Sequence, residues 1–206
     1  LRRIALEING KKEIRSFFEI PISVPFVNFV GNKEDLQGIQ IYKKLALLNE
    51  LPADEAEFVF RDCCGSVEWA RQMAESRPFA MIENLFRRAD EIWFSLSTAD
   101  RLEAFASHPK IGSKKPAPIQ QVRAASWSVD EQSGMETAEM DVSERLAEAN
   151  SLYEAKFGFI FIVCASGRSA EEMLVMCQRR LGNSLETELN IAADEQRKIT
   201  EIRLGK

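Results

Sequence analysis

The sequence contains a single histidine, His108, among its 206 residues. Protein-bound zinc and iron usually take several ligands from His and Cys, so one histidine excludes a histidine-based metal centre. The four cysteines form no C-x-x-C pair, and adjacent Cys63 and Cys64 cannot easily ligate one metal ion or form an unstrained disulfide. Apolar neighbours of Cys164 and Cys177 indicate buried free thiols, as in a reducing compartment. We therefore expect no metal site.

Long apolar runs and an excess of positive charge are also missing. The longest apolar run, around residues 157–165, is about half of the roughly 20 residues that a membrane helix needs. The formal net charge of −5 argues against broad nucleic-acid binding, which needs a basic face. Hydrophobic residues make up 45% of the chain, too many for a disordered protein. These features predict a soluble globular protein with neither a nucleic-acid nor a membrane partner.

Apolar residues recur at three-to-four spacing through most of the chain, which is typical of amphipathic helices. The pattern predicts an all-α fold, a single compact domain of about eight helices over residues 35–206. Ser66, Ser97 and Ser169 are expected to cap the starts of three of these helices. Residues 1–34 lack the apolar core of a signal peptide and are predicted to be an appendage outside the main fold.

Two segments interrupt the helical pattern. Ile111–Gln120 contains glycine, two prolines and two lysines and is predicted to be a loop. Phe157–Cys164 has the composition of a strand, but no other segment offers a convincing sheet partner, so we expect a buried extended segment or an irregular helix. Its buried backbone groups then need hydrogen-bond partners, some of which a flat polar ligand could supply.

His108 is the first candidate for chemistry. It is expected at the C-terminal end of a helix, just before Pro109, at the mouth of the lysine-containing loop. The helix dipole favours a protonated imidazole, and partial exposure would leave it titrating near neutrality, as a general acid or base does. The alternative is a helix-terminal histidine that only binds a backbone carbonyl.

Ser128, Glu131 and Gln132 form a second candidate group. Ser128 and Glu131 stand three residues apart at an expected helix start, which is the spacing of a structural capping box. Gln132 can both donate and accept hydrogen bonds, as an imide- or urea-like substrate requires.

Arg203 is the third candidate. On the last predicted helix it shares a face with Gln196 and with apolar residues. A guanidinium on such a face needs a partner, either a buried carboxylate or an anionic ligand. It could also extend to the surface along its apolar stem.

Five elements of the chain, taken in order, resemble one known family. They are Cys63-Cys64-Gly65-Ser66, the run ending in His108-Pro109-Lys110-Ile111-Gly112, Ser128-x-x-Glu131-Gln132, the long segment Tyr153–Ser169, and the tail Glu195–Leu204. Together they cover about residues 47–206. The sequence is similar to the OHCU decarboxylases, the 2-oxo-4-hydroxy-4-carboxy-5-ureidoimidazoline decarboxylases of urate breakdown, and most of all to the plant type.

The resemblance implies an all-helical, cofactor-free lyase that converts OHCU into (S)-allantoin and carbon dioxide. It implies that His108 is catalytic, and we expect Glu131 to assist by steering its ring. It also implies that Arg203 helps to hold the anionic substrate. The other residues expected to contact the substrate are Pro109, Ser128, Val129, Asp130, Glu131, Gln132, Phe161, Ile162, Val163, Cys164 and Ala165, the last five largely through their backbone.

The resemblance further implies a homodimer and a peroxisomal or cytoplasmic location. In plants the domain is often fused to a transthyretin-like hydrolase domain, so the chain could be one half of a bifunctional allantoin synthase. Two alternatives remain open. One is a non-catalytic helical interaction module that binds an acidic partner through Lys110–Lys115. The other is a hydrolase of a ureido compound on the same fold.

Overall fold

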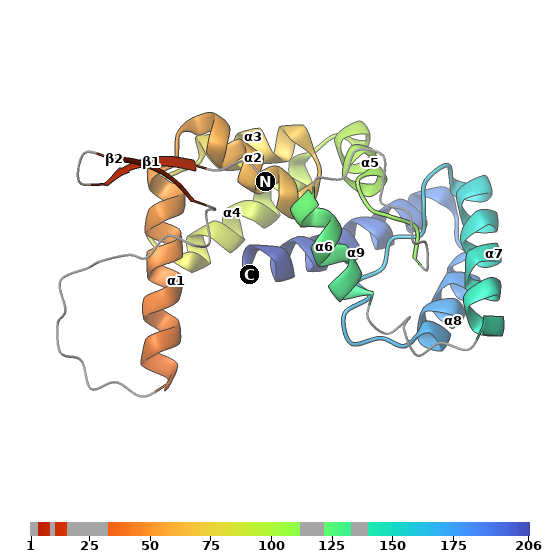
Figure 1. Ribbon diagram of the computed structural model, residues 1–206. Helices are drawn as coiled ribbons and strands as arrows, with labels where there is room; N and C mark the ends of the chain where they lie inside the picture. Colours follow the sequence, from red (N-terminus) through yellow and green to blue (C-terminus); the bar gives the residue numbers. More distant parts are fainter. Residues whose placement is uncertain (1–3, 9–10, 16–32, 112–121, 133–139) are drawn as a thin grey trace. The chain divides into compact units, whose positions relative to one another are not determined.

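The computed structural model describes residues 4–8, 11–15, 33–111, 122–132 and 140–206 (Figure 1). The chain divides into two compact units, Leu1–Ile39 and Gln40–Lys206. The first unit contains an antiparallel hairpin of β1 (Ile4–Ile8) and β2 (Lys11–Arg15), in which Ile8 is opposite Lys11. The sequence analysis did not predict this hairpin. The predicted domain boundary after residue 34 stays a prediction.

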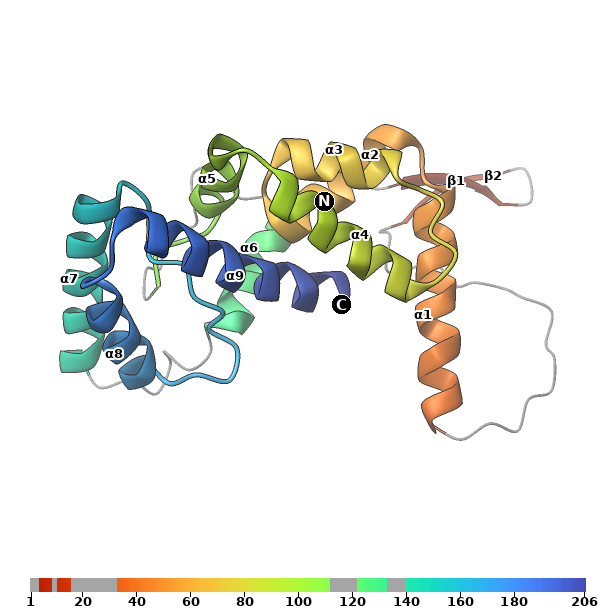
Figure 2. The ribbon, with the colours of Figure 1, turned by 180° about the vertical axis from the view of Figure 1, so that it is seen from behind.

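The second unit is all-α, as predicted. The described part of the chain contains nine helices: α1 (Lys33–Glu50), α2 (Ala53–Cys64), α3 (Val67–Glu75), α4 (Ile82–Ser95), α5 (Thr98–Ala106), α6 (Val122–Glu131), α7 (Met140–Phe157), α8 (Ala170–Arg180) and α9 (Leu185–Leu204). Helices α7 and α8 lie side by side in both views (Figures 1 and 2). Helix α9 packs against α2, α4 and α5. None of the described helices is both long enough and apolar enough to cross a bilayer.

Three predicted serine caps are confirmed by their hydrogen bonds. The hydroxyl oxygens of Ser66 and Ser97 accept bonds from backbone N–H groups in the first turns of α3 and α5, at 3.2 and 3.3 Å. Ser169 forms a complete capping box with Glu172 at the start of α8. Each cap satisfies N–H groups that a helix start otherwise leaves unpaired. The predicted loop at Ile111–Gln120 falls almost entirely outside the described residues.

Helix α2 ends at Gly65, which has a left-handed backbone conformation with φ of +91° and donates its N–H to the carbonyl of Arg61. A side chain at this position would meet the hydroxyl of Ser107, because a Cβ there would lie 2.1 Å from its Oγ. Glycine therefore permits both the turn and the close approach of the α5 terminus. The residue after Ser107 is His108, so this contact fixes the start of the segment that carries the imidazole.

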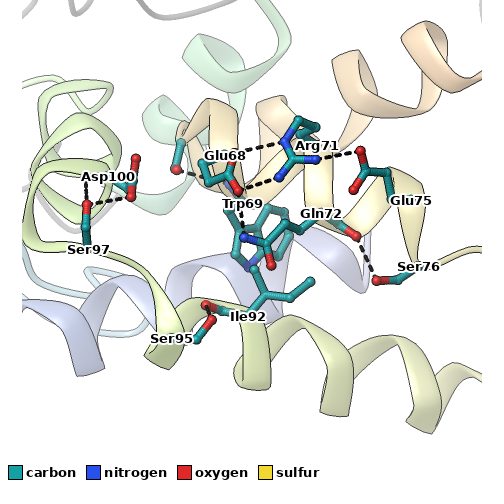
Figure 3. A network of polar contacts seen from close by, with 11 residues as sticks. Glu68, Trp69, Arg71, Gln72, Glu75, Ser76, Ile92, Ser95, Ser97 and Asp100 are labelled. Carbon is teal, nitrogen blue, oxygen red and sulfur yellow. Dashed lines mark hydrogen bonds and ion pairs between the residues drawn. The ribbon is translucent and has the colours of Figure 1, made fainter.

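The core is formed by large buried side chains from α2, α3, α5 and α7, among them Phe60, Trp69, Phe105 and Tyr153. Trp93 connects α4 to α9, because its indole N–H donates to the carbonyl of Ala193 at 3.0 Å. The opposite face of α3 is a polar surface, where Arg71 pairs with Glu68 and Glu75 (Figure 3). Exposed pairs of this kind contribute little to stability, so burial around Trp69 is what holds α3 in place.

Candidate active site

One pocket collects most of the predicted site residues. It encloses about 420 Å³, including its solvent-filled mouth, between the end of α5, α6, the segment after α7, and α9. Nine predicted residues line it: His108, Pro109, Ser128, Glu131, Gln132, Phe161, Ile162, Val163 and Ala165. Four further residues complete the lining: Ile111, Ser166, Ile199 and Ile202. Four separate stretches of the sequence therefore meet around one space.

Four predicted residues are not placed in this lining. Cys164 and Arg203 are buried but do not line the pocket. The side chains of Val129 and Asp130 lie outside the described part of the chain. A substrate contact by any of these four side chains stays a prediction.

The predicted capping box of Ser128 and Glu131 is wrong. Both residues lie in the last turn of α6, which begins at Val122, and not at a helix start. The Ser128 hydroxyl donates to the carbonyl of Ala124 four residues earlier, at 2.9 Å, as interior helical serines commonly do. Their three-residue spacing instead places both side chains on one face of the helix.

Arg203 faces this side of α6 from α9. Its Nε and Nη2 donate to Oε1 and Oε2 of Glu131 at 3.0 and 2.8 Å, which is a bidentate pair. Nη2 also donates to Oγ of Ser128 at 3.0 Å. The side chains of Arg203 and Glu131 are only 2% and 10% exposed. Of the two partners considered for this arginine, the structure shows the buried carboxylate.

His108 is held in a neutral state. Its Nε2 is fully buried and has no hydrogen bond of ordinary geometry to the described residues. Burial, followed by the positive charge of Arg203, lowers the pKa of His108 to about 3, while a contact with the Gln196 side chain works in the opposite direction. The expected titration near neutrality is therefore wrong, because this part of the ring is enclosed and a cation lies nearby.

We expected Glu131 to orient the ring of His108, but the described contacts of Glu131 are with other residues. The carboxylate of Glu131 binds Arg203 and lies 3.5 Å from Nζ of Lys206. The side chain beside the imidazole is Gln196, which the sequence analysis placed only on the same helix face as Arg203. That shared face was the one signal in the sequence that pointed to Gln196.

The segment after α7 forms one wall of the pocket. The predicted irregular segment began at Phe157, which instead ends α7, but residues 158–165 form neither helix nor strand and residues 161–165 are buried, as predicted. Charged side chains hold its backbone from behind. Nη1 of Arg180 donates to the carbonyl of Ile162 at 2.8 Å, and the N–H of Cys164 donates to Oε2 of Glu195 at 2.8 Å. These bonds satisfy part of the backbone polarity that made the segment difficult to assign.

Arg180 belongs to a buried ionic cluster that the sequence analysis missed. Its Nε donates to Oε1 of Glu188 at 2.6 Å, and Nδ2 of Asn183 donates to Oε2 of the same carboxylate at 2.7 Å. The hydroxyl of Tyr153 also donates to Glu188, and burial raises the pKa of this tyrosine, which keeps it protonated. The Arg180 guanidinium lies 4.7 Å from the ring centre of Phe161. The cluster thus fixes a backbone atom and a side chain of the pocket wall.

The described residues contain no group of three or more His, Cys, Asp or Glu side chains placed to hold a metal ion. The polar groups that the pocket offers are an imidazole, a carboxylate, a carboxamide, hydroxyls and backbone amides. They can exchange protons and bind a polar ring by hydrogen bonds.

Comparisons with known proteins agree with this arrangement. The family model of the OHCU decarboxylases matches residues 49–205. The uric acid degradation bifunctional protein TTL of Arabidopsis thaliana is 47% identical over 146 residues, which are 70% of this chain and 44% of that protein. The 2-oxo-4-hydroxy-4-carboxy-5-ureidoimidazoline decarboxylase of Amia calva is 30% identical over 131 residues, 62% of this chain and 73% of that protein.

Among solved structures, an OHCU decarboxylase crystallised in the presence of (S)-allantoin matches with a TM-score of 0.61 and 42% identity. The match covers 70% of this chain and 93% of that one. The chain spans less than half the length of the bifunctional relative from Arabidopsis thaliana. The matched residues contain the whole described pocket, and the chain belongs to the OHCU decarboxylase family.

Proposed function

We propose that this chain catalyses the decarboxylation of OHCU to (S)-allantoin and carbon dioxide, the reaction of a carboxy-lyase. The observation that carries the proposal is the convergence of His108, Glu131 and the wall around Ile162 on one pocket. Membership of the family supports the same reaction.

Loss of carbon dioxide breaks a carbon–carbon bond and leaves an electron pair behind. OHCU can accommodate this pair itself, through the conjugated C=N and C=O groups of its ring. The protein then has to position the ring, orient the carboxylate and move protons. The electron pair moves toward the C=N group, whose nitrogen takes up a proton from the carboxylic acid or from water. A second proton leaves the 4-hydroxyl group as it becomes a carbonyl, and one is added to the ureido-bearing carbon on one face.

Several residues in and next to the pocket have proposed roles that fit their state in the structure. A neutral His108 is suited to accept the hydroxyl proton. Gln132 can donate to and accept from the ureido group, and backbone groups of the pocket wall can bind the ring edge. Arg203 holds Glu131 and Ser128 in place, and its positive charge also favours an anionic substrate nearby.

Circular dichroism with freshly generated OHCU tests this function. We expect rapid formation of optically active allantoin, whereas slow formation of racemic product would mean that the chain does not catalyse the reaction. His108→Asn should lower kcat by about 10²–10⁴-fold, the usual contribution of a general acid or base. Retention of more than about a tenth of kcat would contradict the catalytic role of His108.

The same assay separates the alternatives. A ureido hydrolase would not accelerate the formation of optically active allantoin from OHCU. A non-catalytic module would depend on Lys110–Lys115, most of which falls outside the described residues, and would not need His108. The resemblance also leads us to propose a homodimer and a peroxisomal or cytoplasmic location. Light scattering and localisation of a tagged full-length protein test these two points.

A further inference from the structure

Gln196 lies next to the catalytic candidate and has no role in the proposed reaction so far. Its side chain is fully buried in α9. Its Nε2 donates to the carbonyl oxygen of Cys64 at 3.4 Å and to Oγ1 of Thr200 at 3.2 Å. The Cys64 carbonyl can only accept, so the NH₂ end of the amide must face it.

This orientation determines what the other end of the amide offers. With Nε2 turned toward Cys64, the Oε1 atom of Gln196 is the end of the amide that remains for the neighbouring imidazole of His108. Oε1 of Gln196 and Nε2 of His108 are both fully buried, and neither has a hydrogen-bond partner of ordinary geometry in the described part of the chain. A carbonyl oxygen only accepts, so the nitrogen that faces it must carry a proton.

We propose that Gln196 is a positioning residue that keeps the proton of the neutral His108 ring on Nε2 and leaves Nδ1 as the proton-accepting nitrogen. The tautomer of a histidine is set by the bond that its other nitrogen makes, and a wrong tautomer removes general-base function even when the ring stays in place. The catalytic consequence of this inference rests on the proposed function. The tautomer itself does not.

Because the chain contains one histidine, its tautomer can be read directly. The protein is labelled with ¹⁵N-histidine, and long-range ¹H–¹⁵N spectra are recorded between pH 5 and 8. We expect a neutral ring with the proton on Nε2 throughout. A wild-type spectrum with the proton on Nδ1 would overturn the proposal.

Two substitutions test whether Gln196 sets the tautomer of His108. Gln196→Met removes the acceptor at similar size, so the Nδ1-protonated form should appear, and kcat for OHCU should fall about 10- to 100-fold with KM within about threefold. Gln196→Glu keeps an acceptor, so the Nε2 proton should stay, while the negative charge should raise the pKa of His108. An unchanged Nε2–H tautomer in a folded Gln196→Met protein contradicts the proposal.

Gln72→Met is the matched control, because Gln72 is an amide of α3 that donates to Glu68 at 2.8 Å, away from the pocket lining (Figure 3). It should preserve the tautomer and kcat. If Gln196→Met does not fold, two measurements still test the proposal. The wild-type protein and the Gln196→Glu protein must both carry the proton on Nε2, and a proton on Nδ1 in either one contradicts the proposal. A wild-type protein with the Nε2 proton but no turnover of OHCU would support the role of Gln196 and contradict the proposed function.

Discussion

Arg203 and Glu131 are 72 residues apart in the chain and form a buried bidentate ion pair directly behind the pocket. The pair joins α9 to α6, and Ser128 extends it toward the pocket surface. Glu131→Gln removes the carboxylate charge and leaves the guanidinium of Arg203 buried without a counter-charge. Loss of one partner of a buried pair typically costs about 3–5 kcal/mol. We expect a loss of this size in the free energy of unfolding, measured by urea denaturation.

Glu201→Gln is the control for this change. Glu201 pairs with Arg197 on the same helix at 3.3 Å, but its side chain is 56% exposed. An exposed pair contributes at most about 1 kcal/mol. Equal losses in the free energy of unfolding would show that the buried Arg203–Glu131 pair contributes no more to stability than an exposed pair.

The low pKa of His108 predicts how stability depends on pH. The unfolded chain binds a proton at His108 below about pH 6.5, and the folded chain does so only below about 3. Between these values the unfolded state holds more protons, so this residue makes stability rise with pH, by at most about 1.4 kcal/mol per pH unit. His108→Gln should flatten the curve between pH 4 and 6. If the free energy of unfolding depends on pH in the same way in both proteins, the neutral state of the ring is contradicted.

Arg180 should affect the reaction without touching the substrate. Arg180→Lys keeps a positive charge beside Glu188 but loses the bond to the carbonyl of Ile162 and the stacking on Phe161. A wall displaced by about 1 Å can cost up to about 10²-fold in rate, so we expect kcat/KM to fall at least about tenfold. Arg179→Lys changes an exposed neighbour in α8 and should have no effect on steady-state kinetics.

Gly65 is expected to be intolerant of a side chain. Gly65→Ala imposes a left-handed backbone on alanine and places its Cβ against Ser107. Gly167→Ala provides a control for the backbone alone, because Gly167 has φ of +77° and open space around it. We expect about 1–2 kcal/mol of destabilisation for Gly167→Ala and distinctly more for Gly65→Ala. Equal values in thermal or urea denaturation would show that the contact with Ser107 is easily relieved.

Local signals in the sequence were sufficient for most of the fold. Serine caps and apolar periodicity depend on residues within one or two turns, and they correctly indicated an all-α fold and three helix starts. The position of α6 was missed because Ser128-x-x-Glu131 has the same spacing at a helix start as in its last turn. The first unit's hairpin was missed because β1 is mostly apolar and β2 mostly charged, so neither short strand has a clear alternation.

Nine of the predicted site residues line one pocket, but the sequence did not show which side chains pair with one another. The helix face of Arg203 showed that a partner was required, but whether this was Glu131 or a ligand depends on how α6 and α9 pack. The same holds for Arg180, whose partners Ile162 and Glu188 come from separate elements. The charge state of His108 depends on its burial and on the positive charge of Arg203, which lies on another helix and far along the chain.

The attachment of the pocket wall through main-chain atoms has a practical consequence for engineering. Arg180 and Glu195 bind the carbonyl of Ile162 and the amide of Cys164, groups that every amino acid except proline retains. Side chains along this stretch can therefore be exchanged while its path is preserved. A library randomised at Ile162 and Val163 is a rational starting point for accepting bulkier ring compounds.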